Sequence, residues 1–404
     1  MIITNIGMLH MIVDPYVERL CGQEMENGHV AMPNAWLRIR RGYIHSFGRM
    51  GSAIIENETE IDAKGGHVLP AFCDSHTHIV YAGSRHGEFL DKINGLSYEE
   101  IAARGGGILN SADLLHTTSE DELFELAMGR LNEMIAKGTG AVEIKSGYGL
   151  NLEDELKMLR VIARMKEATR ATVRATFLGA HAVGREYAGR QGEYVDHLIR
   201  DMLPAVAAEG LADYVDVFCD RGFFTVEETA RILDAAARYG MQPKIHANEL
   251  DNSGGVQVGV SHGAVSVDHL ERMGPDEIEA MKGSRTVATM LPGASFFLGM
   301  PYAPAREAMR GGLAVALASD FNPGSSPSGD MRFVMALGCI QMRMTPKAAL
   351  AACTINGAAA MGIGHSHGAI APGRRAALII TKPIPALEYI PYHYTSPWIE
   401  RVIL

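Results

Sequence analysis

Between residues 67 and 363, short apolar runs alternate along the chain with longer segments in which apolar residues recur every three or four positions. The short runs predict buried strands, and the longer periodic segments predict amphipathic helices. Eight short runs predict eight strands, at residues 68–72, 141–144, 173–178, 214–219, 243–246, 264–267, 286–290 and 314–318. Strands that alternate with helices are typical of βαβ units and hence of a parallel sheet.

Helix boundaries in this region carry recognisable signals. Three predicted helices begin with a capping side chain followed three residues later by an acidic one: Ser119 with Glu122, Asn151 with Asp154, and Thr225 with Glu228. Gly138 and Gly240 stand where a helix end favours positive φ. Eight strands within about 300 residues favour a closed (β/α)8 TIM-type barrel. An open doubly wound sheet is the alternative, but no G-x-G-x-x-G follows the first strand, which disfavours its nucleotide-binding form.

The two ends of the chain differ from the middle. Residues 1–66 contain short β-rich pieces, such as 35–39, interrupted by glycines, and residues 377–380 and 398–404 return to this pattern. We therefore expect residues 1–66 and 364–404 to build one small β-sandwich module together. Residues 67–363 are then expected to form the barrel.

Composition narrows the range of partners. The formal net charge is −10 and no basic run occurs, which disfavours nucleic acid and anionic membranes as partners. No apolar run reaches the length of a membrane span, and the N-terminus lacks the basic start of a signal peptide, so we interpret it as a strand. Five scattered cysteines suit reduced thiols better than a disulfide framework. We expect a cytoplasmic protein that acts on a small molecule.

Four candidate metal ligands lie at predicted strand ends, where barrels carry their chemistry. His76 and His78 end the first strand, and side chains two residues apart on a strand point to one face. His246 ends the strand at 243–246, and Asp320 follows the strand at 314–318. Three imidazoles and one carboxylate suit Zn²⁺ or Fe.

An H-x-H pair alone is a weak signal. His365-Ser366-His367 is a second such pair, and because no strand precedes it we expect a surface loop. Three further ionisable residues, Glu249, His269 and His181, fall at the same predicted rim. A carboxylate such as Glu249 beside a metal site suits general acid–base work. The two histidines, each taken alone, are equally compatible with buried structural positions.

Several longer motifs carry a family resemblance. They are Tyr81-Ala82-Gly83-Ser84-Arg85, Arg104-Gly105-Gly106-Gly107-Ile108, Lys145-Ser146-Gly147-Tyr148-Gly149, Gly179-Ala180-His181, Ser319-Asp320-Phe321-Asn322-Pro323-Gly324-Ser325 and Thr354-Ile355-Asn356-Gly357-Ala358. With the strand-end residues, they make the chain resemble the amidohydrolase superfamily. Within it, the resemblance is to enzymes that open the ring of 4-imidazolone-5-propanoate in histidine degradation. Ser75 departs from the pattern, where a proline is expected, as does the stretch 373–377, which lacks the usual Asp-Ala-Asp.

The resemblance implies one metal ion, zinc or iron, held by His76, His78, His246 and Asp320. A second ion is not expected, because binuclear relatives use a lysine on the fourth strand and residues 214–219 contain none. Lys145 lies on the second strand and is expected to be structural or to support the ligands. In the implied reaction, Asp320 accepts a proton from the attacking water and His269 stabilises that water or the oxyanion. Glu249 then delivers a proton to the leaving ring nitrogen.

The resemblance also implies the substrate contacts. Arg85 is expected to bind the propionate, because a guanidinium pairs with a carboxylate through two parallel hydrogen bonds. The other implied contacts are Tyr98, Tyr148, His181, Glu249, Asn322, Gly324 and Ser325. The glycines at 105–107 are expected to form a lid over the pocket, and a homodimer is the family expectation. A cytosine or guanine deaminase and a non-catalytic binding protein are the alternatives. Arg85 disfavours the deaminase, because a neutral base offers no carboxylate.

Overall fold

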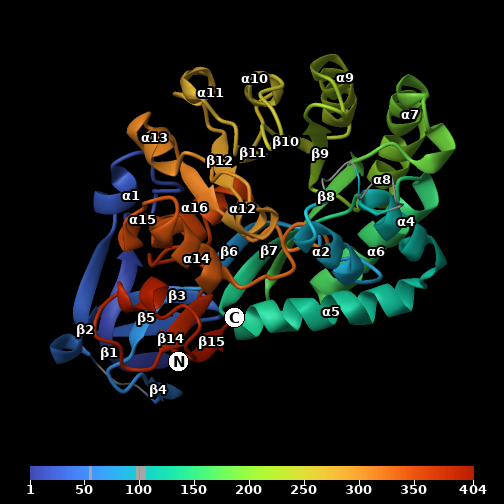
Figure 1. Ribbon diagram of the computed structural model, residues 1–404. Helices are drawn as coiled ribbons and strands as arrows, with labels where there is room; N and C mark the ends of the chain where they lie inside the picture. Colours follow the sequence, from blue (N-terminus) through green and yellow to red (C-terminus); the bar gives the residue numbers. More distant parts are fainter. Residues whose placement is uncertain (54–56, 97–99, 101–105) are drawn as a thin grey trace.

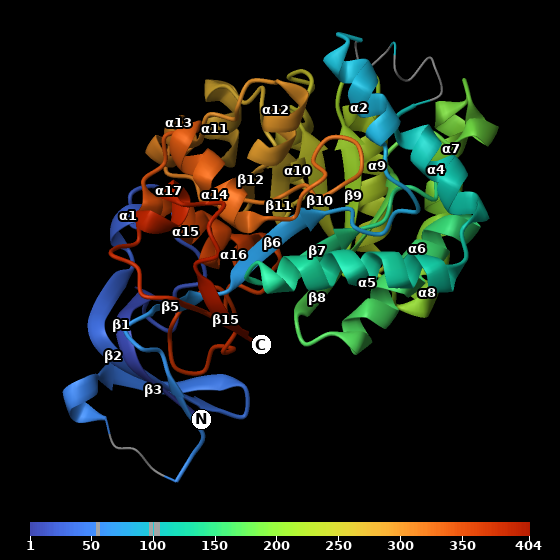
Figure 2. The same cartoon turned by 60° about the horizontal axis from the view of Figure 1, so that its bottom comes forward.

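The computed structural model describes residues 1–53, 57–96, 100 and 106–404. A barrel occupies the middle of the chain, and a second sheet built from both chain ends lies beside it (Figure 1). Turning the molecule shows both termini on the side of that second sheet (Figure 2). Among the helices in the described part of the chain, none combines the length and apolarity that a membrane crossing requires.

Eight parallel strands form the barrel, and they pair in sequence order. They are β6 (Phe72–Thr77), β7 (Thr139–Lys145), β8 (Thr172–Ala180), β9 (Tyr214–Cys219), β10 (Gln242–Ala247), β11 (Ser266–His269), β12 (Val287–Met290) and β13 (Val315–Leu317). The residues that follow β13 join the first strand: the Asp320 amide donates to the His76 carbonyl at 3.0 Å, and the His78 amide donates to the Phe321 carbonyl at 2.9 Å. The predicted TIM-type barrel is confirmed.

Helices surround the barrel, and the predicted start signals act as expected. The side chains of Ser119 and Asn151 accept from the amides three residues on, and Thr225 with Glu228 forms a complete capping box. Gly138 and Gly240 have φ of 101° and 76°, as the predicted helix ends require. The helices are α1 (Glu24–Asn27), α2 (His86–Ile93), α4 (Ile108–Thr117), α5 (Glu120–Ala136), α6 (Leu152–Ala168), α7 (Gln191–His197), α8 (Leu203–Glu209), α9 (Val226–Ala237), α10 (Gly255–Ser261), α11 (Pro275–Met281), α12 (Pro292–Leu298), α13 (Ala305–Arg310), α14 (Met331–Ile340), α15 (Pro346–Cys353), α16 (Ile355–Ala360) and α17 (Tyr389–Tyr392).

The second sheet draws on both ends of the chain. Its strands are β1 (Ile2–Ile12), β2 (Val30–Arg40), β3 (Tyr43–Arg49), β4 (Glu60–Asp62), β5 (His67–Pro70), β14 (Leu378–Thr381) and β15 (Ile399–Ile403). They run in the order β15-β14-β5-β1-β2-β3, with β4 beside β1. A separate apolar cluster that includes Ile3, Leu37 and Ile380 forms its core. The two chain ends therefore build one sheet, while the boundaries at 66/67 and 363/364 stay a prediction.

The predicted first barrel strand, 68–72, is wrong in detail. Its residues divide between two sheets: β5 belongs to the second sheet, and the barrel strand β6 begins at Phe72. The chain passes from one sheet to the other between two consecutive residues. The Ala71 amide donates to the Ala377 carbonyl, whereas the Phe72 amide donates to the Gly138 carbonyl, both at 2.9 Å. An apolar run cannot reveal this division, because both strands are buried.

The surface interpretation of the second H-x-H pair is also only half right. His365 is exposed, but His367 is buried and its Nε2 lies 2.9 Å from the Thr172 hydroxyl at the start of β8. Burial lowers the pKa of His367 to about 4, so the ring is neutral near pH 7. Loop position alone did not reveal that one imidazole packs against the base of the barrel.

Candidate metal and substrate site

Five ligand-type side chains converge where the barrel strands end: His76, His78, His246, His269 and Asp320. The Nε2 atoms of His76 and His78 lie 3.2 Å apart, and the Asp320 Oδ1 lies 3.5 and 3.6 Å from them. Metal–ligand bonds of about 2.1 Å give a tetrahedral shell an edge of about 3.4 Å. The His246 ring lies 4.5 Å from that of His76, centre to centre, and its Nε2 has no hydrogen-bond partner among the described residues. These residues therefore fit a divalent cation.

Two buried carboxylates orient two of the imidazoles. The Asp268 Oδ2 lies 2.7 Å from His76 Nδ1, and the Asp216 Oδ2 lies 3.0 Å from His246 Nδ1. An ionised carboxylate only accepts, so His76 Nδ1 carries the proton and His76 Nε2 keeps its lone pair for the cluster. His246 Nδ1 lies within ion-pair distance of Asp216 but is not aligned with it as a hydrogen bond. The backbone at two of the cluster residues is also unusual. His269 and Asp320 adopt φ of 85° and 52°, a conformation that non-glycine residues rarely take.

Protonation separates the histidines into two kinds. Burial lowers the pKa of His76 and His78 well below the usual value, which keeps them in the neutral form that binds metal. Burial alone would also lower the pKa of His269. The carboxylates of Glu249 and Glu271, each 3.5 Å from its ring nitrogens, outweigh burial and raise that pKa instead. Both carboxylates therefore favour the protonated form of His269, whereas a metal ligand must be neutral.

The Glu249 carboxyl faces the same cluster from the turn after β10. Burial raises its pKa to about 7, although the charge of His269 opposes this shift. A carboxyl with a pKa near neutrality holds and releases a proton readily at physiological pH. Glu249 lines the cavity although it lies beyond the end of β10.

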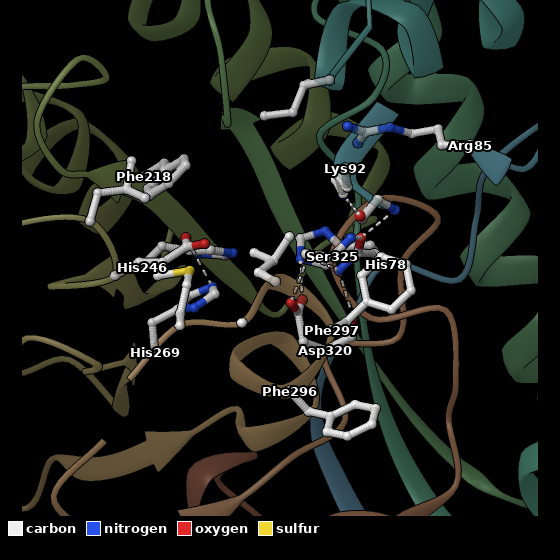
Figure 3. A pocket seen from close by; sticks show the side chains of 18 of the residues that line it. His78, Arg85, Lys92, Phe218, His246, His269, Phe296, Phe297, Asp320 and Ser325 are labelled. Atoms are coloured by element: carbon white, nitrogen blue, oxygen red, sulfur yellow. Dashed lines mark hydrogen bonds and ion pairs between the residues drawn. The ribbon is translucent and has the colours of Figure 1, made fainter. Parts of the chain in front are cut away.

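A cavity of about 560 Å³ opens onto the cluster. Figure 3 shows His246 and His269 on one side of it and Arg85 with Lys92 on the other. Of the predicted substrate contacts, those that line the cavity are Arg85, Tyr148, His181, Glu249, Asn322, Gly324 and Ser325. Tyr98 and Gly105, the first glycine of the expected lid, lie outside the described residues.

Arg85 stands at the start of α2 and is held by an internal carboxylate. Its Nε and one terminal nitrogen donate to Glu88 Oε2 at 2.9 and 2.7 Å. Glu88 Oε1 in turn accepts from the Gly107 amide at 3.1 Å. A Cβ on Gly324 would stand 2.1 Å from the Arg85 guanidinium, so this position has no room for a side chain. Glu88 and the close approach of Gly324 therefore fix the position of the Arg85 guanidinium at the cavity wall.

Lys92 is a cavity residue that the sequence analysis missed. Its Nζ donates to the Gly324 carbonyl at 2.5 Å and lies 5.1 Å from the centre of the Phe297 ring. It follows Arg85 by seven residues, two turns of α2, so both point to the same side. The signal was present as that spacing, but the segment 86–93 was not predicted to be helical.

Two further predicted substrate contacts, His181 and Asn322, differ in the hydrogen bonds that their side chains already make within the protein. His181 Nδ1 donates to the Gly147 carbonyl at 2.9 Å, and burial lowers the pKa of this ring to about 3. The neutral ring thus leaves Nε2 as an acceptor. The Asn322 side chain instead bonds within its own turn, where Oδ1 accepts from the Gly324 and Ser325 amides at 2.7 and 2.8 Å. Asn322 therefore shapes the loop that carries Ser325.

Comparison with known proteins identifies a matching family and similar relatives. Residues 67–400 match the family described as "Amidohydrolase family". The chain is 52% identical to a protein of Flavobacterium johnsoniae named imidazolonepropionase, over 100% of this chain and 98% of that protein. It is 50% identical to one of Christiangramia forsetii with the same name, again over 100% and 98%.

A solved structure shows the same architecture at low identity. An adenosine deaminase from Xanthomonas campestris, described with bound zinc, superposes with a TM-score of 0.71 over 100% of this chain and 91% of that chain. The two sequences are 15% identical, so this likeness speaks for the fold alone.

Proposed function

The chain belongs to the amidohydrolase family, and we propose that it hydrolyses the ring amide C–N bond of 4-imidazolone-5-propanoate to give N-formimino-L-glutamate in histidine degradation. One observation carries this proposal: the cavity joins a metal-type cluster on one side to two cationic side chains, Arg85 and Lys92, on the other. In a substrate with a cyclic amide and a carboxylate arm, the amide can face the cluster while the carboxylate binds to the two cations.

The family and the side chains at the cluster support a divalent metal ion. We propose one ion, zinc or iron, held by His76, His78, His246 and Asp320. Such an ion, when bound, supplies activation of water at neutral pH and polarisation of a carbonyl. His269 is left out of the ligand set because two carboxylates hold it protonated, whereas a ligand imidazole must be neutral.

Binding of the substrate follows from the charges on the cavity wall. The propionate pairs with Arg85 and Lys92, while the ring amide faces the cluster. His181 Nε2, an acceptor, takes a hydrogen bond from a ring N–H. Tyr148, almost fully buried beside His78 and His181, closes one side of the ring site and excludes water.

Two carboxyl groups move the proton during ring opening. Asp320 accepts a proton from the attacking water, and the cation of His269 stabilises the negative charge that develops on the carbonyl oxygen. Glu249, with a pKa near 7, donates a proton to the ring nitrogen as the C–N bond breaks. The product gains one water: its oxygen joins the carbonyl carbon and a proton joins the nitrogen.

The alternative function is deamination of a neutral base, as the names of several structural neighbours suggest for those proteins. Arg85 and Lys92 argue against it here, because a neutral base carries no anionic group that could bind to either cation. The test is a direct comparison on metal-loaded protein: absorbance loss of imidazolonepropanoate against ammonia release from cytosine and guanine. Turnover of the propanoate alone supports the proposal, and ammonia release from a base with no ring opening contradicts it.

We further propose that the protein is a cytoplasmic homodimer whose catalytic barrel lies within residues 67–363. All five cysteines are unpaired, which agrees with a reducing compartment. Light scattering on purified protein tests the dimer, since a single-chain mass at micromolar concentration would contradict it.

A further inference from the structure

Five charged side chains, none of them exposed to solvent, form a layer inside the barrel below the metal-type cluster. They come from four strands: Glu143 and Lys145 from β7, Asp216 from β9, Lys244 from β10 and Asp268 from β11. Three carboxylates meet two ammonium groups, so the layer carries one net negative charge. Buried charges of this kind persist only when they are paired.

Lys145 is the member that connects the two sides of this layer. Its Nζ lies 2.7 Å from Asp216 Oδ2 and 3.5 Å from Asp268 Oδ2. The same two oxygens are the ones that face His246 Nδ1 and His76 Nδ1. One ammonium group thus contacts both carboxylates that orient imidazoles of the cluster.

We propose that Lys145 is a positioning residue for the metal site, which fixes His76 and His246 through the carboxylates of Asp268 and Asp216. This inference rests on the proposed metal site. Without the ammonium group, the two buried carboxylates lose the cation that both contact, and their like charges disfavour their present positions. A carboxylate that moves no longer holds its imidazole, and the Nε2 lone pair is no longer aimed at the ion.

Lys244 provides a matched comparison. It is equally buried, pairs with the other oxygen of Glu143, and donates to the Ser75 carbonyl at 3.2 Å. Among the described residues, its ion pair is with Glu143 and not with either orienting carboxylate. Lys145→Met and Lys244→Met therefore remove the same charge from the same layer, and they differ in whether Asp216 and Asp268 lose a partner.

The experiment measures metal affinity and needs no turnover. Zinc affinity of the wild type, Lys145→Met and Lys244→Met is determined by competition with a chromophoric chelator. Loss of an outer partner of a metal-binding histidine typically weakens binding about 10–100-fold, and we expect this loss for Lys145→Met but a change under about 3-fold for Lys244→Met. The absorption bands of the cobalt(II)-loaded protein should change in Lys145→Met alone, because they report ligand geometry.

A second pair of variants covers the case in which Lys145→Met does not fold. Glu143→Gln/Lys145→Met restores the net charge of the layer but still lacks the ammonium group, and Glu143→Gln is its control. The double variant should bind zinc about 10–100-fold more weakly than Glu143→Gln. Equal affinity in either matched pair overturns the inference. A wild type that binds no metal would instead refute the proposed function, so the two failures are distinguishable.

Discussion

Replacing Arg85 by methionine removes the guanidinium proposed to bind the propionate. A hydrogen bond to a charged group contributes about 1.5–3 kcal/mol, so its loss alone raises KM about 10–150-fold. The structure adds a second effect, because Glu88 loses both donors from Arg85 and is left as a buried carboxylate next to the vacated guanidinium position. At about 6–8 Å and an effective dielectric constant of about 20, its repulsion of the propionate amounts to about 2–3 kcal/mol, a further factor of about 30–150.

Glu88→Gln provides the control for that second effect. Steady-state ring opening, followed by absorbance, gives KM and kcat for the wild type, Arg85→Met and Arg85→Met/Glu88→Gln. We expect the double variant to bind substrate more weakly than the wild type but more tightly than Arg85→Met, with kcat changed far less than KM. An unchanged KM in Arg85→Met refutes the carboxylate assignment. Equal KM values in the two variants refute the role given to Glu88.

Four further outcomes follow from the structure. Glu249→Gln keeps its bound metal, measured by elemental analysis, but loses about 10²–10⁴-fold in kcat. Lys92→Met raises KM about 10-fold through loss of one charge-assisted hydrogen bond, with kcat near the wild-type value. Gly324→Ala moves the Arg85 guanidinium and lowers kcat/KM about 100-fold at unchanged metal content. Burial, aided by the charge of His67, lowers the pKa of His10 from 6.5 to about 3 in the folded protein. As the pH drops from 6.5 toward 3, His10 is therefore protonated in the unfolded chain but not in the folded one, and the free energy of unfolding falls. His10→Gln should flatten that slope in urea unfolding, and an unaltered slope would contradict the assignment.

The barrel was predictable because its signals are local. Alternating apolar runs, the caps at Ser119, Asn151 and Thr225, and the glycines after two helices each depend on a few neighbouring residues, and the structure bears them out. The division of residues 67–72 between two sheets was not predictable. It depends on which distant strand pairs with each residue, and the sequence shows only that the run is buried.

The cluster was predictable in its members but not in their charge states. Histidine and carboxylate at strand ends indicated the convergence of His76, His78 and Asp320, and of His246 with His76. The protonation of His269 depends on Glu249 and Glu271, whose carboxylates approach its two ring nitrogens from the turn after β10 and from the segment after β11. Lys92 was missed because residues 86–93 were not predicted to be helical. The expected supporting role of Lys145 gained its partners only in the structure, because they come from strands far apart in the chain.

The central claim is that one metal ion at this cluster enables ring opening of imidazolonepropanoate. The most direct test strips the protein with a chelator, returns zinc or iron in small steps, and measures bound metal per chain and the ring-opening rate on the same samples. The account predicts no turnover without metal and a rate that rises linearly until one ion is bound per chain, with a product heavier by one water. Full turnover of the stripped protein, or a rate that rises only with the second ion, would contradict it.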